Sequence, residues 1–445
     1  MPLETPPNAE SAMPHIIAPN ATPSTGTLTL LGDKSLSHRA LLFAALATGQ
    51  STIRNFPASG VTFAMLRCLR ALGVAAELDA ERHLLTVDGV GLHGFKAPAE
   101  PLDCGNSATT LRLLAGVLAG AGIPCTLTGS TGLCKRPMNR IVDPLRLMGA
   151  DITATAGCAP LTLRPAPLHG LSYTLPVASA QVKSCLLLAG LSADAPTALL
   201  EPGPSRDHTE RMLATMGARV QHVAPPAYGA VILPQSEPLA PLTLDLPGDI
   251  SSAAFLILRA TLIPGSDLTL RNICINPTRT GFIEAMQRLG AHITLENPTT
   301  QAGEPVADLH IRHPGKLRTG GDVTFDGHLI VRMIDEVPAL MIAATQADHP
   351  VTIREAAELR AKESDRIAIM AKALTALGAD ITEYPDGFTI RPSTLTGGKL
   401  IETHSDHRVA MSTLLAAQIA QAPTPFDDLA IINESFPGFR ALVHA

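Results

Sequence analysis

Apolar residues along the chain form two alternating kinds of helical segment, and the first kind is apolar on nearly every face. Each segment of this kind is a run of small and aliphatic residues opened by Ser, Asn or Asp. The pattern returns about every 70 residues, which is longer than the period of a solenoid repeat. The six segments begin at Ser37, Asn106, Ser179, Asp249, Asp335 and Asp406. Because such helices have no polar face for solvent, we expect them to be buried.

The second kind of segment is an amphipathic helix that ends in Leu-Gly or Met-Gly. A glycine just past the last turn adopts the left-handed conformation that stops a helix. These glycines are Gly73, Gly149, Gly217, Gly290 and Gly378. Stretches of alternating polarity follow, such as 379–382 and 388–391, and predict strands. The sixth copy breaks off near Phe439, and we expect the extended segment 26–31 to supply its missing strand.

The two patterns together predict a mixed α/β protein of six βαβ-type units, grouped as two lobes of three. We expect the chain to start in lobe 1 (21–33), to build lobe 2 (34–247), and to return to lobe 1 (248–445). Sheets should surround the buried helices of each lobe. An open binding scaffold is the alternative, since repeats are common in such proteins.

Composition excludes several classes of protein. With 46% apolar residues and a net charge of −6, the 445-residue chain is not expected to be disordered. Only 3% of its residues are aromatic, so it lacks stacking partners for bases and no nucleic acid is expected. No apolar run reaches the ~18 residues of a membrane span, so no membrane partner is expected. Seven scattered cysteines without a CxxC motif indicate reduced thiols. We expect a cytoplasmic protein in which residues 1–20, which do not resemble a secretory signal, are a disordered tail.

Cations gather near the starts of the helices of the first kind. Helix N-termini attract anions, and six of them facing one cleft would bind a ligand with several negative charges. The cations are Lys34, Arg39, Arg136, Arg206, Arg279, Lys362, Arg366 and Arg408. Taken singly, each is more often a solvated surface residue.

Three other motifs predict no additional site. Residues 26–35 resemble a phosphate loop, but the glycine spacing is wrong. His404 and His407 have no third ligand at metal-site spacing, so no metal is expected. Cys134, beside Lys135 and Arg136, is either an acid or nucleophile with a lowered pKa or an ordinary loop thiol.

Six strings in series resemble the 5-enolpyruvylshikimate-3-phosphate synthases from about residue 20 to the C-terminus. They are DKSLSHR (33–39), GNSAT (105–109), KRPM (135–138), SAQVKS (179–184), KESDR (362–366) and DHR (406–408). The resemblance implies two lobes, each of three βαβαββ-like repeats around buried parallel helices. It also implies transfer of the enolpyruvyl group of phosphoenolpyruvate to the 5-hydroxyl of shikimate 3-phosphate, by a monomer without cofactor.

The resemblance further implies a role for individual residues. For shikimate 3-phosphate it implies Lys34, Ser35, Arg39, Ser179, Ala180, Gln181, Arg206, Asp335 and Lys362. For phosphoenolpyruvate it implies Lys34, Asn106, Ala108, Thr109, Arg136, Gln181, Arg366 and Arg408. The catalytic residues would be Asp335 as base, Glu363 as acid, and Lys34, which contacts both substrates.

Two departures from the family pattern are informative. Many members have Gly where Ala108 stands, and the added methyl group should crowd glyphosate more than the shorter phosphoenolpyruvate, so the resemblance implies tolerance to glyphosate. Glu434 stands where many relatives have a phosphate-binding Lys. Two alternatives stay open: the sister enzyme acting on UDP-N-acetylglucosamine, with Cys134 as its acid, and a catalytically silent scaffold that binds phosphometabolites.

Overall fold

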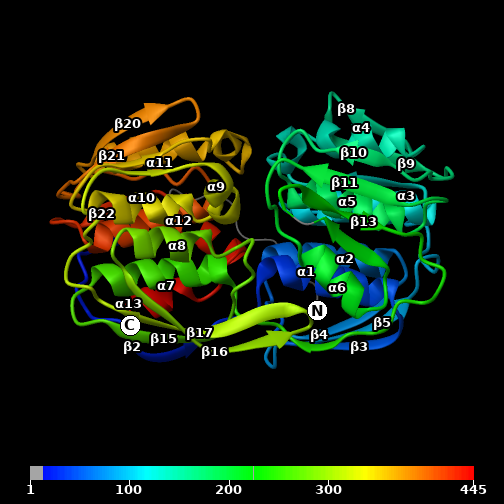
Figure 1. Cartoon of the computed structure of the whole chain (residues 1–445), viewed down its shortest axis with the longest axis horizontal. Helices are drawn as coiled ribbons and strands as arrows, with labels where there is room; N and C mark the ends of the chain where they lie inside the picture. The colour runs from blue at the N-terminus through cyan, green and yellow to red at the C-terminus, as the bar shows by residue number, and fades with distance from the viewer. Residues whose placement is uncertain (1–13, 224, 445) are drawn as a thin grey trace.

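The computed structural model describes residues 14–223 and 225–444. They form two bodies side by side, each with its own hydrophobic core (Figure 1). The core of lobe 2 lies between Leu36 and Leu246, with Cys274 added from the other half of the chain. The core of lobe 1 contains Ile17, Leu30 and residues from Ile250 to Val443. The fold is the mixed α/β architecture that the sequence predicts.

Lobe 2 contains three repeats of the same order of elements. The first has α1 (Lys34–Leu46), β3 (Thr48–Arg54), α2 (Gly60–Ala71), β4 (Ala75–Asp79) and β5 (Leu84–Val90). The second has β6 (Leu102–Asp103), α3 (Ala108–Ala121), β7 (Cys125–Thr128), η1 (Leu133–Lys135), α4 (Asn139–Leu147), β8 (Asp151–Thr155) and β9 (Cys158–Arg164). The third has β10 (Ser172–Thr174), α5 (Ala180–Gly190), β11 (Thr197–Glu201), α6 (His208–Thr215), β12 (Val220–Val223) and β13 (Tyr228–Ile232), and β14 (Thr243–Asp245) follows.

Lobe 1 repeats this order with more variation. Its first two strands are β1 (His15–Ile17) and β2 (Thr25–Thr29). The fourth repeat has α7 (Ile250–Leu262), β15 (Asp267–Cys274), α8 (Gly281–Arg288), β16 (His292–Gln301) and β17 (Glu304–Arg312). The fifth has β18 (Val323–Phe325), α9 (Gly327–Met333), α10 (Val337–Thr345), β19 (Val351–Ile353), η2 (Ala357–Ala361), α11 (Arg366–Ala376), β20 (Asp380–Tyr384) and β21 (Gly387–Arg391). The sixth has α12 (His407–Gln418), β22 (Thr424–Phe426), η3 (Ala430–Glu434) and α13 (Phe439–His444).

Five four-stranded sheets share one topology, in which one edge strand pairs in parallel with its neighbour and the other pairs are antiparallel. The expectation for 26–31 is wrong, because β2 completes the sheet of the fourth repeat by pairing with β15. The sixth repeat instead pairs β22 with β1. Residues 15–17 are therefore a strand and not part of a disordered tail, while residues 1–13 lie outside the described residues.

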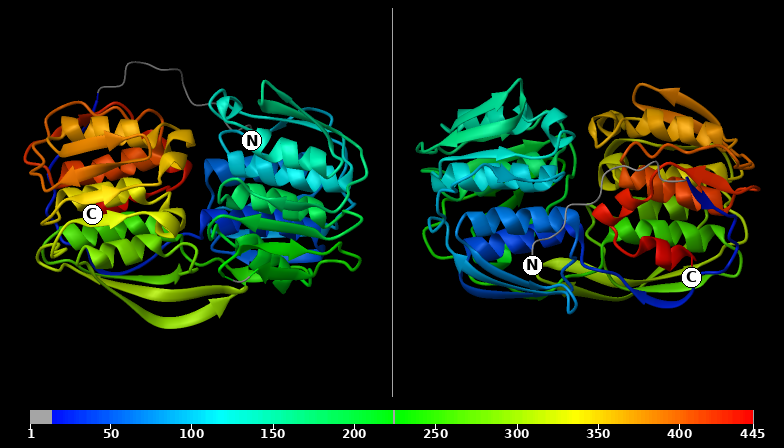
Figure 2. Two further views of the ribbon diagram at one scale, coloured as in Figure 1. Left: turned by 45° about the horizontal axis from the view of Figure 1, so that its top comes forward. Right: turned by 180° about the vertical axis from the view of Figure 1, so that it is seen from behind.

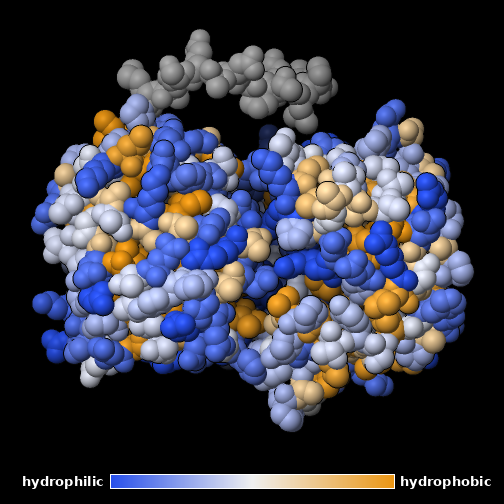
Figure 3. Space-filling model, turned by 90° about the horizontal axis from the view of Figure 1, so that it is seen from above, coloured by the Kyte–Doolittle hydropathy of each residue, from blue (hydrophilic) through white to orange (hydrophobic). Residues whose placement is uncertain are grey.

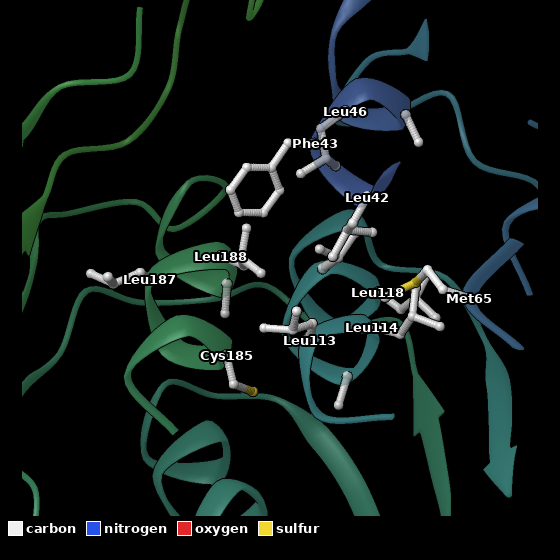
Figure 4. Packing of buried hydrophobic residues seen from close by; sticks show 14 of the residues in the cluster. Leu42, Phe43, Leu46, Met65, Leu113, Leu114, Leu118, Cys185, Leu187 and Leu188 are labelled. Atoms are coloured by element: carbon white, nitrogen blue, oxygen red, sulfur yellow. The ribbon is translucent and has the colours of Figure 1, made fainter. Parts of the chain in front are cut away.

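The helices of the first kind are α1, α3, α5, α7, α10 and α12, and they form the centre of each lobe (Figure 2). In lobe 2, Phe43, Leu113 and Leu188 from three of these helices point toward one another (Figure 4). Gly116 lets α3 approach α5, because a Cβ at this position would overlap the carbonyl oxygen of Cys185. The glycines predicted to end the amphipathic helices adopt positive φ as expected, with 95° at Gly149 and 100° at Gly378.

The chain crosses between the lobes twice, at Gly32 and Gly248, which form an isolated antiparallel bridge. Beneath the crossings, Arg279 pairs with Asp33 at 3.0 Å and with Asp249 at 3.3 Å. The hairpin β16–β17 extends from lobe 1 toward lobe 2, where Gly303 O accepts a hydrogen bond from Arg211 (Figure 1). Among the described residues, no helix combines the length and apolar composition needed to cross a bilayer.

Candidate active site

A cavity of about 590 Å³ lies between the lobes, where the surface is hollowed and flanked largely by hydrophilic residues (Figure 3). It brings together every residue assigned to a substrate or to catalysis from the sequence. They are Lys34, Ser35, Arg39, Asn106, Ala108, Thr109, Arg136, Ser179, Ala180, Gln181, Arg206, Asp335, Lys362, Glu363, Arg366 and Arg408. Nine Lys or Arg side chains and five Asp or Glu side chains line the cavity, so a net acidic chain surrounds a cationic cleft.

Helix N-termini supply much of the wall, but only four of the six predicted helices have first-turn residues in the lining, since those of α7 and α10 are not among them. Lys34, Ala108, Ala180 and Arg408 lie in the first turns of four buried helices and line the cavity. Three of these helices, α1, α3 and α12, start where a capping side chain binds a free N–H group. Asp33 accepts from Leu36 N, Ser107 from Thr110 N, and Asp406 from Arg408 N and Val409 N. The unpaired N–H groups and helix dipoles favour anions in the cleft.

Asp335 lies at the centre of a group of cations from both lobes. Its carboxylate oxygens lie 2.5 Å from Arg206 Nη2, 3.3 Å from Lys362 Nζ and 3.4 Å from Arg366 Nη1. Arg408 Nη1 donates to the Asp335 carbonyl oxygen at 2.9 Å. Burial alone would raise the pKa of Asp335, but Lys362, Arg206, Arg408 and Arg366 hold it well below its usual range. The carboxylate is therefore ionised and able to accept a proton.

Glu363 is the second acidic group of the cavity and also lies between arginines. Its oxygens lie 2.6 Å from Arg366 Nη2 and 3.5 Å from Arg136 Nη1, and the latter pair spans the two lobes. Burial would raise the pKa of Glu363, but Arg366, Arg136, His407 and Lys34 lower it well below its usual range. In this arrangement Glu363 therefore carries no proton to donate near neutral pH.

Lys34 lies near both carboxylates, and His407 lies near Glu363. Within the described residues, no carboxylate oxygen lies within ion-pair distance of Lys34 Nζ, so the ammonium group can meet a ligand. Burial and then Arg408 lower the pKa of Lys34, while Glu363 and Asp335 raise it. Burial and then Lys34 lower the pKa of His407 to about 3, so this imidazole is neutral. Its Nε2 is buried and has no hydrogen-bond partner in the described part of the chain.

Gln181 connects the first turns of α5 and α3. Its Nε2 donates to Thr109 Oγ1 at 2.9 Å, and its Oε1 accepts a hydrogen bond from Arg112. Arg112 also donates to Pro137 O at 3.2 Å, in the loop that carries Arg136. Sequence reasoning missed Arg112. Its place one turn after Ala108 on the same helix is the signal that could have found it.

Arg39 and Arg206 occupy the wall of lobe 2. Arg39 is buried and donates to Thr209 Oγ1 at 2.7 Å, Ser184 Oγ at 2.8 Å and Ser35 O at 3.0 Å. Arg206 donates to Ser35 Oγ at 3.2 Å as well as to Asp335. Arg39 thus stabilises the wall through contacts within lobe 2, while Arg206 contacts Asp335 of lobe 1.

Three further residues singled out in the sequence have distinct locations. Arg279 does not line the cavity, because Asp33 and Asp249 hold it at the crossings between the lobes. Cys134 is also outside the lining, and its thiol lies 3.5 Å from Gly129 O. Glu434 does line the cavity, and its carboxylate lies against Gly60 in the first turn of α2. Glu434 thus adds a negative charge where the cleft is otherwise cationic.

Contacts across the cleft that the sequence did not predict join the lobes at its rim. Arg140 of lobe 2 makes two hydrogen bonds to Glu358 of lobe 1, at 3.3 and 3.4 Å. The rings of Tyr228 and His328 meet edge to face, with 5.1 Å between their centroids. The cavity is therefore bounded by both lobes, which contact each other beside it.

Comparison with known proteins shows the family of the chain. Residues 20–442 match the family model described as EPSP synthase (3-phosphoshikimate 1-carboxyvinyltransferase). The chain is 49% identical over 417 residues to the 3-phosphoshikimate 1-carboxyvinyltransferase of Acidithiobacillus ferrooxidans, covering 94% of each chain. The corresponding protein of Syntrophomonas wolfei is 46% identical over 428 residues, which cover 95% of this chain and 97% of the relative.

Solved structures give the same result. The EPSP synthase of Acinetobacter baumannii superposes with a TM-score of 0.84 at 40% identity, over 96% of this chain and 97% of that one. The enolpyruvyl transferase NikO of Streptomyces tendae shares the fold, with a TM-score of 0.78 at 20% identity over 97% of each chain. The sequence, the fold and the cleft lead to one conclusion: the chain belongs to the EPSP synthase family.

Proposed function

We propose an assignment of the cleft residues to the reaction of this family. The chain transfers the enolpyruvyl group of phosphoenolpyruvate to the 5-hydroxyl of shikimate 3-phosphate and releases phosphate, a step of the shikimate route to the aromatic amino acids. The observation that carries the assignment is the position of two carboxylates, Asp335 and Glu363, in one cationic cavity together with Lys34.

Shikimate 3-phosphate occupies the part of the cavity that Arg206, Lys362 and Asp335 share. This assignment is supported by the donors that converge there: Arg206, Lys362 and the hydroxyl of Ser35. A phosphate and ring hydroxyls require such charged and hydroxyl donors. The remaining ligands of this substrate in the proposal are Lys34, Arg39, Ser179, Ala180 and Gln181.

Phosphoenolpyruvate occupies the part lined by the other arginines. Arg136, Arg366 and Arg408 have planar guanidinium groups that suit bidentate pairing with a carboxylate or a phosphate. The first two pair with the carboxylates of Glu363, Asp335 and Asp406, and a dianionic ligand can compete for these arginines. The remaining ligands of this substrate in the proposal are Lys34, Asn106, Ala108, Thr109 and Gln181.

The chemical step joins the 5-hydroxyl oxygen to C2 of phosphoenolpyruvate. Asp335 takes the hydroxyl proton as the C–O bond forms, and Glu363 gives a proton to the methylene carbon, which becomes a methyl group. The C2–O bond to phosphate then breaks, the methyl group returns a proton to the Glu363 carboxylate as the methylene is restored, and the proton held by Asp335 leaves with the phosphate. Lys34, between the two carboxylates and the ligands, stabilises the negative charge that moves through the site.

Binding of phosphoenolpyruvate would allow Glu363 to hold a proton. Arg366 and Arg136 are the cations that most strongly lower the pKa of this carboxyl group. When phosphoenolpyruvate engages these arginines, Glu363 loses their attraction and gains negative neighbours. Both changes raise its pKa, so a proton enters the site with the substrate.

Phosphate release tests the assigned reaction against its alternatives. The protein is mixed with shikimate 3-phosphate and phosphoenolpyruvate, and inorganic phosphate is followed; the proposal predicts release only when both are present. Release with UDP-N-acetylglucosamine instead would favour the sister enzyme. If no phosphate is released with either acceptor, a binding scaffold would be favoured.

The proposal extends to properties of the whole chain. We assign the chain to the cytoplasm as a monomer, supported by seven unpaired cysteines and by a cavity to which both lobes of one chain contribute. Ala108 at the start of α3 makes the enzyme tolerant to glyphosate, because its methyl group narrows the phosphoenolpyruvate pocket. The proposal also includes the lobe boundaries expected from the sequence, at 33/34 and 247/248. Light scattering after size exclusion would test the monomer.

A further inference from the structure

We propose that Lys183 is a positioning residue, which fixes the loop 202–206 and thereby holds Arg206 in place for shikimate 3-phosphate. The inference rests on the binding role proposed above for Arg206. Lys183 lies on α5, is 2% exposed, and is not part of the cavity lining. A lysine buried this deeply is rare and requires charged partners.

The ammonium group of Lys183 binds three points along one stretch of chain. Nζ lies 2.6 Å from Glu201 Oε1 at the end of β11, and 2.8 Å from Glu210 Oε1 in α6. It also donates to the carbonyl oxygen of Ser205 at 3.4 Å. These partners stand before, after and within the loop that joins β11 to α6. Lys183 therefore holds the chain on both sides of the loop and at Ser205 within it.

A second buried cation lies near one of the two glutamates, since burial lowers the pKa of Arg39 to about 10 while Glu210 acts to raise it. Arg39 donates to Thr209 in α6 and to Ser184 in α5, and the hydroxyls of these two residues lie 2.7 Å apart. The buried layer thus contains two cations and two carboxylates beneath the cleft. Burial would lower the pKa of Lys183, but Glu210 and Glu201 raise it, so the lysine stays charged.

The loop that this layer supports carries part of the cleft wall. Pro202, Gly203, Ser205 and Arg206 all line the cavity. Arg206 reaches Ser35 and Asp335 from this loop, and Gly203 packs against His328 of lobe 1. Without Lys183, Glu201 and Glu210 would repel each other across the base of the loop, and the loop would lose its fixed position. Binding of shikimate 3-phosphate would therefore weaken more than binding of phosphoenolpyruvate, because the arginines proposed for phosphoenolpyruvate lie on other elements.

The test is a charge-balanced variant, Lys183→Met with Glu201→Gln, which leaves Glu210 beside Arg39. Calorimetric titration with shikimate 3-phosphate should show Kd raised about tenfold, equivalent to about 1.4 kcal/mol. The KM for phosphoenolpyruvate at saturating shikimate 3-phosphate and kcat should each change less than about twofold, as expected when one substrate's binding alone is lost. A folded variant with an unchanged Kd for shikimate 3-phosphate would overturn the proposal.

Two further variants separate positioning from general destabilisation. Leu188→Ala, at a buried apolar position on the same helix, should lower the urea midpoint of unfolding and leave that Kd unchanged. Lys183→Arg keeps the charge but not the three-point geometry. If the double variant does not fold, an unchanged Kd in Lys183→Arg overturns the proposal.

The test also distinguishes this inference from the role of Arg206. Arg206→Ala should weaken binding of shikimate 3-phosphate at least as much as the double variant does. An unchanged Kd in Arg206→Ala would refute the binding role of Arg206. A raised Kd in Arg206→Ala together with an unchanged Kd in the double variant would refute only the role of Lys183.

Discussion

At the scale of single residues, the cations of the cleft decide which carboxyl groups hold protons. The sequence identified these residues because short strings such as KESDR and DHR carry them together. It also indicated that neighbouring Lys and Arg would oppose a raised pKa at Asp335, and the structure agrees. The sequence did not indicate which cation pairs with which carboxylate, because those contacts join residues such as Arg136 and Glu363, which are far apart in the chain.

His38 makes stability depend on pH. Burial lowers its pKa to about 4, and the ring lies 2.8 Å from Lys34 O and 3.2 Å from Ser107 Oγ. The unfolded chain takes up this proton near pH 6.5, so the stability is fully present above that pH and is lost as pH falls toward 4. Between pH 7.5 and 5.5, wild type should lose about 1 kcal/mol more of its unfolding free energy than His38→Asn. Urea unfolding at both pH values measures this, and equal losses would contradict it.

Ala108 is the residue that we propose determines the response to glyphosate. It is buried in the first turn of α3 and lines the cavity. Ala108→Gly should lower the inhibition constant for glyphosate at least about tenfold, the effect of roughly 1.4 kcal/mol, while the KM for phosphoenolpyruvate changes less. Inhibition curves at fixed phosphoenolpyruvate measure it. A low-micromolar inhibition constant for the wild-type chain would show that the tolerance is absent.

At the scale of elements, the burial and the ends of the helices were predictable from the sequence, but the sheet that each N-terminal strand joins was not. A helix without a polar face and a glycine after the last turn are local signals. The pairing of β2 with β15, and of β1 with β22, joins segments more than two hundred residues apart. No local pattern distinguishes one open sheet edge from another, so the sequence alone placed segment 26–31 in the wrong repeat.

The contact of α3 with α5 sets the spacing of two helix N-termini in the cleft. Gly116→Ala would place a methyl group on the carbonyl oxygen of Cys185. We expect it to lower the unfolding free energy by about 1–3 kcal/mol, since overpacking outweighs the gain in helix propensity. Gly120→Ala on the same helix is the matched control, because its nearest atoms are 3.3 Å away and allow small adjustments. Urea unfolding of both variants measures the difference, and a Gly116→Ala protein as stable as wild type would refute this role of Gly116.

At the scale of the whole molecule, the net charge of −6 conceals a cleft with a surplus of cations. The low aromatic content fits cores of closely packed small-residue helices and a site that holds its ligands by charge. The sequence predicted the two lobes and the cleft between them, since six capped helices imply a convergent anion site. It did not predict Arg140–Glu358 or Tyr228–His328, because these contacts join residues of different lobes that are far apart in the chain.

Turnover by Asp335→Asn tests the central claim most directly. The substitution keeps the side chain's size and removes its ability to take a proton. The rate of phosphate release at saturating substrates should fall about 10²- to 10⁴-fold, the range of a lost general base, while calorimetry still detects binding of both substrates. Near-normal turnover in a variant that binds shikimate 3-phosphate and phosphoenolpyruvate would show that Asp335 is not the base.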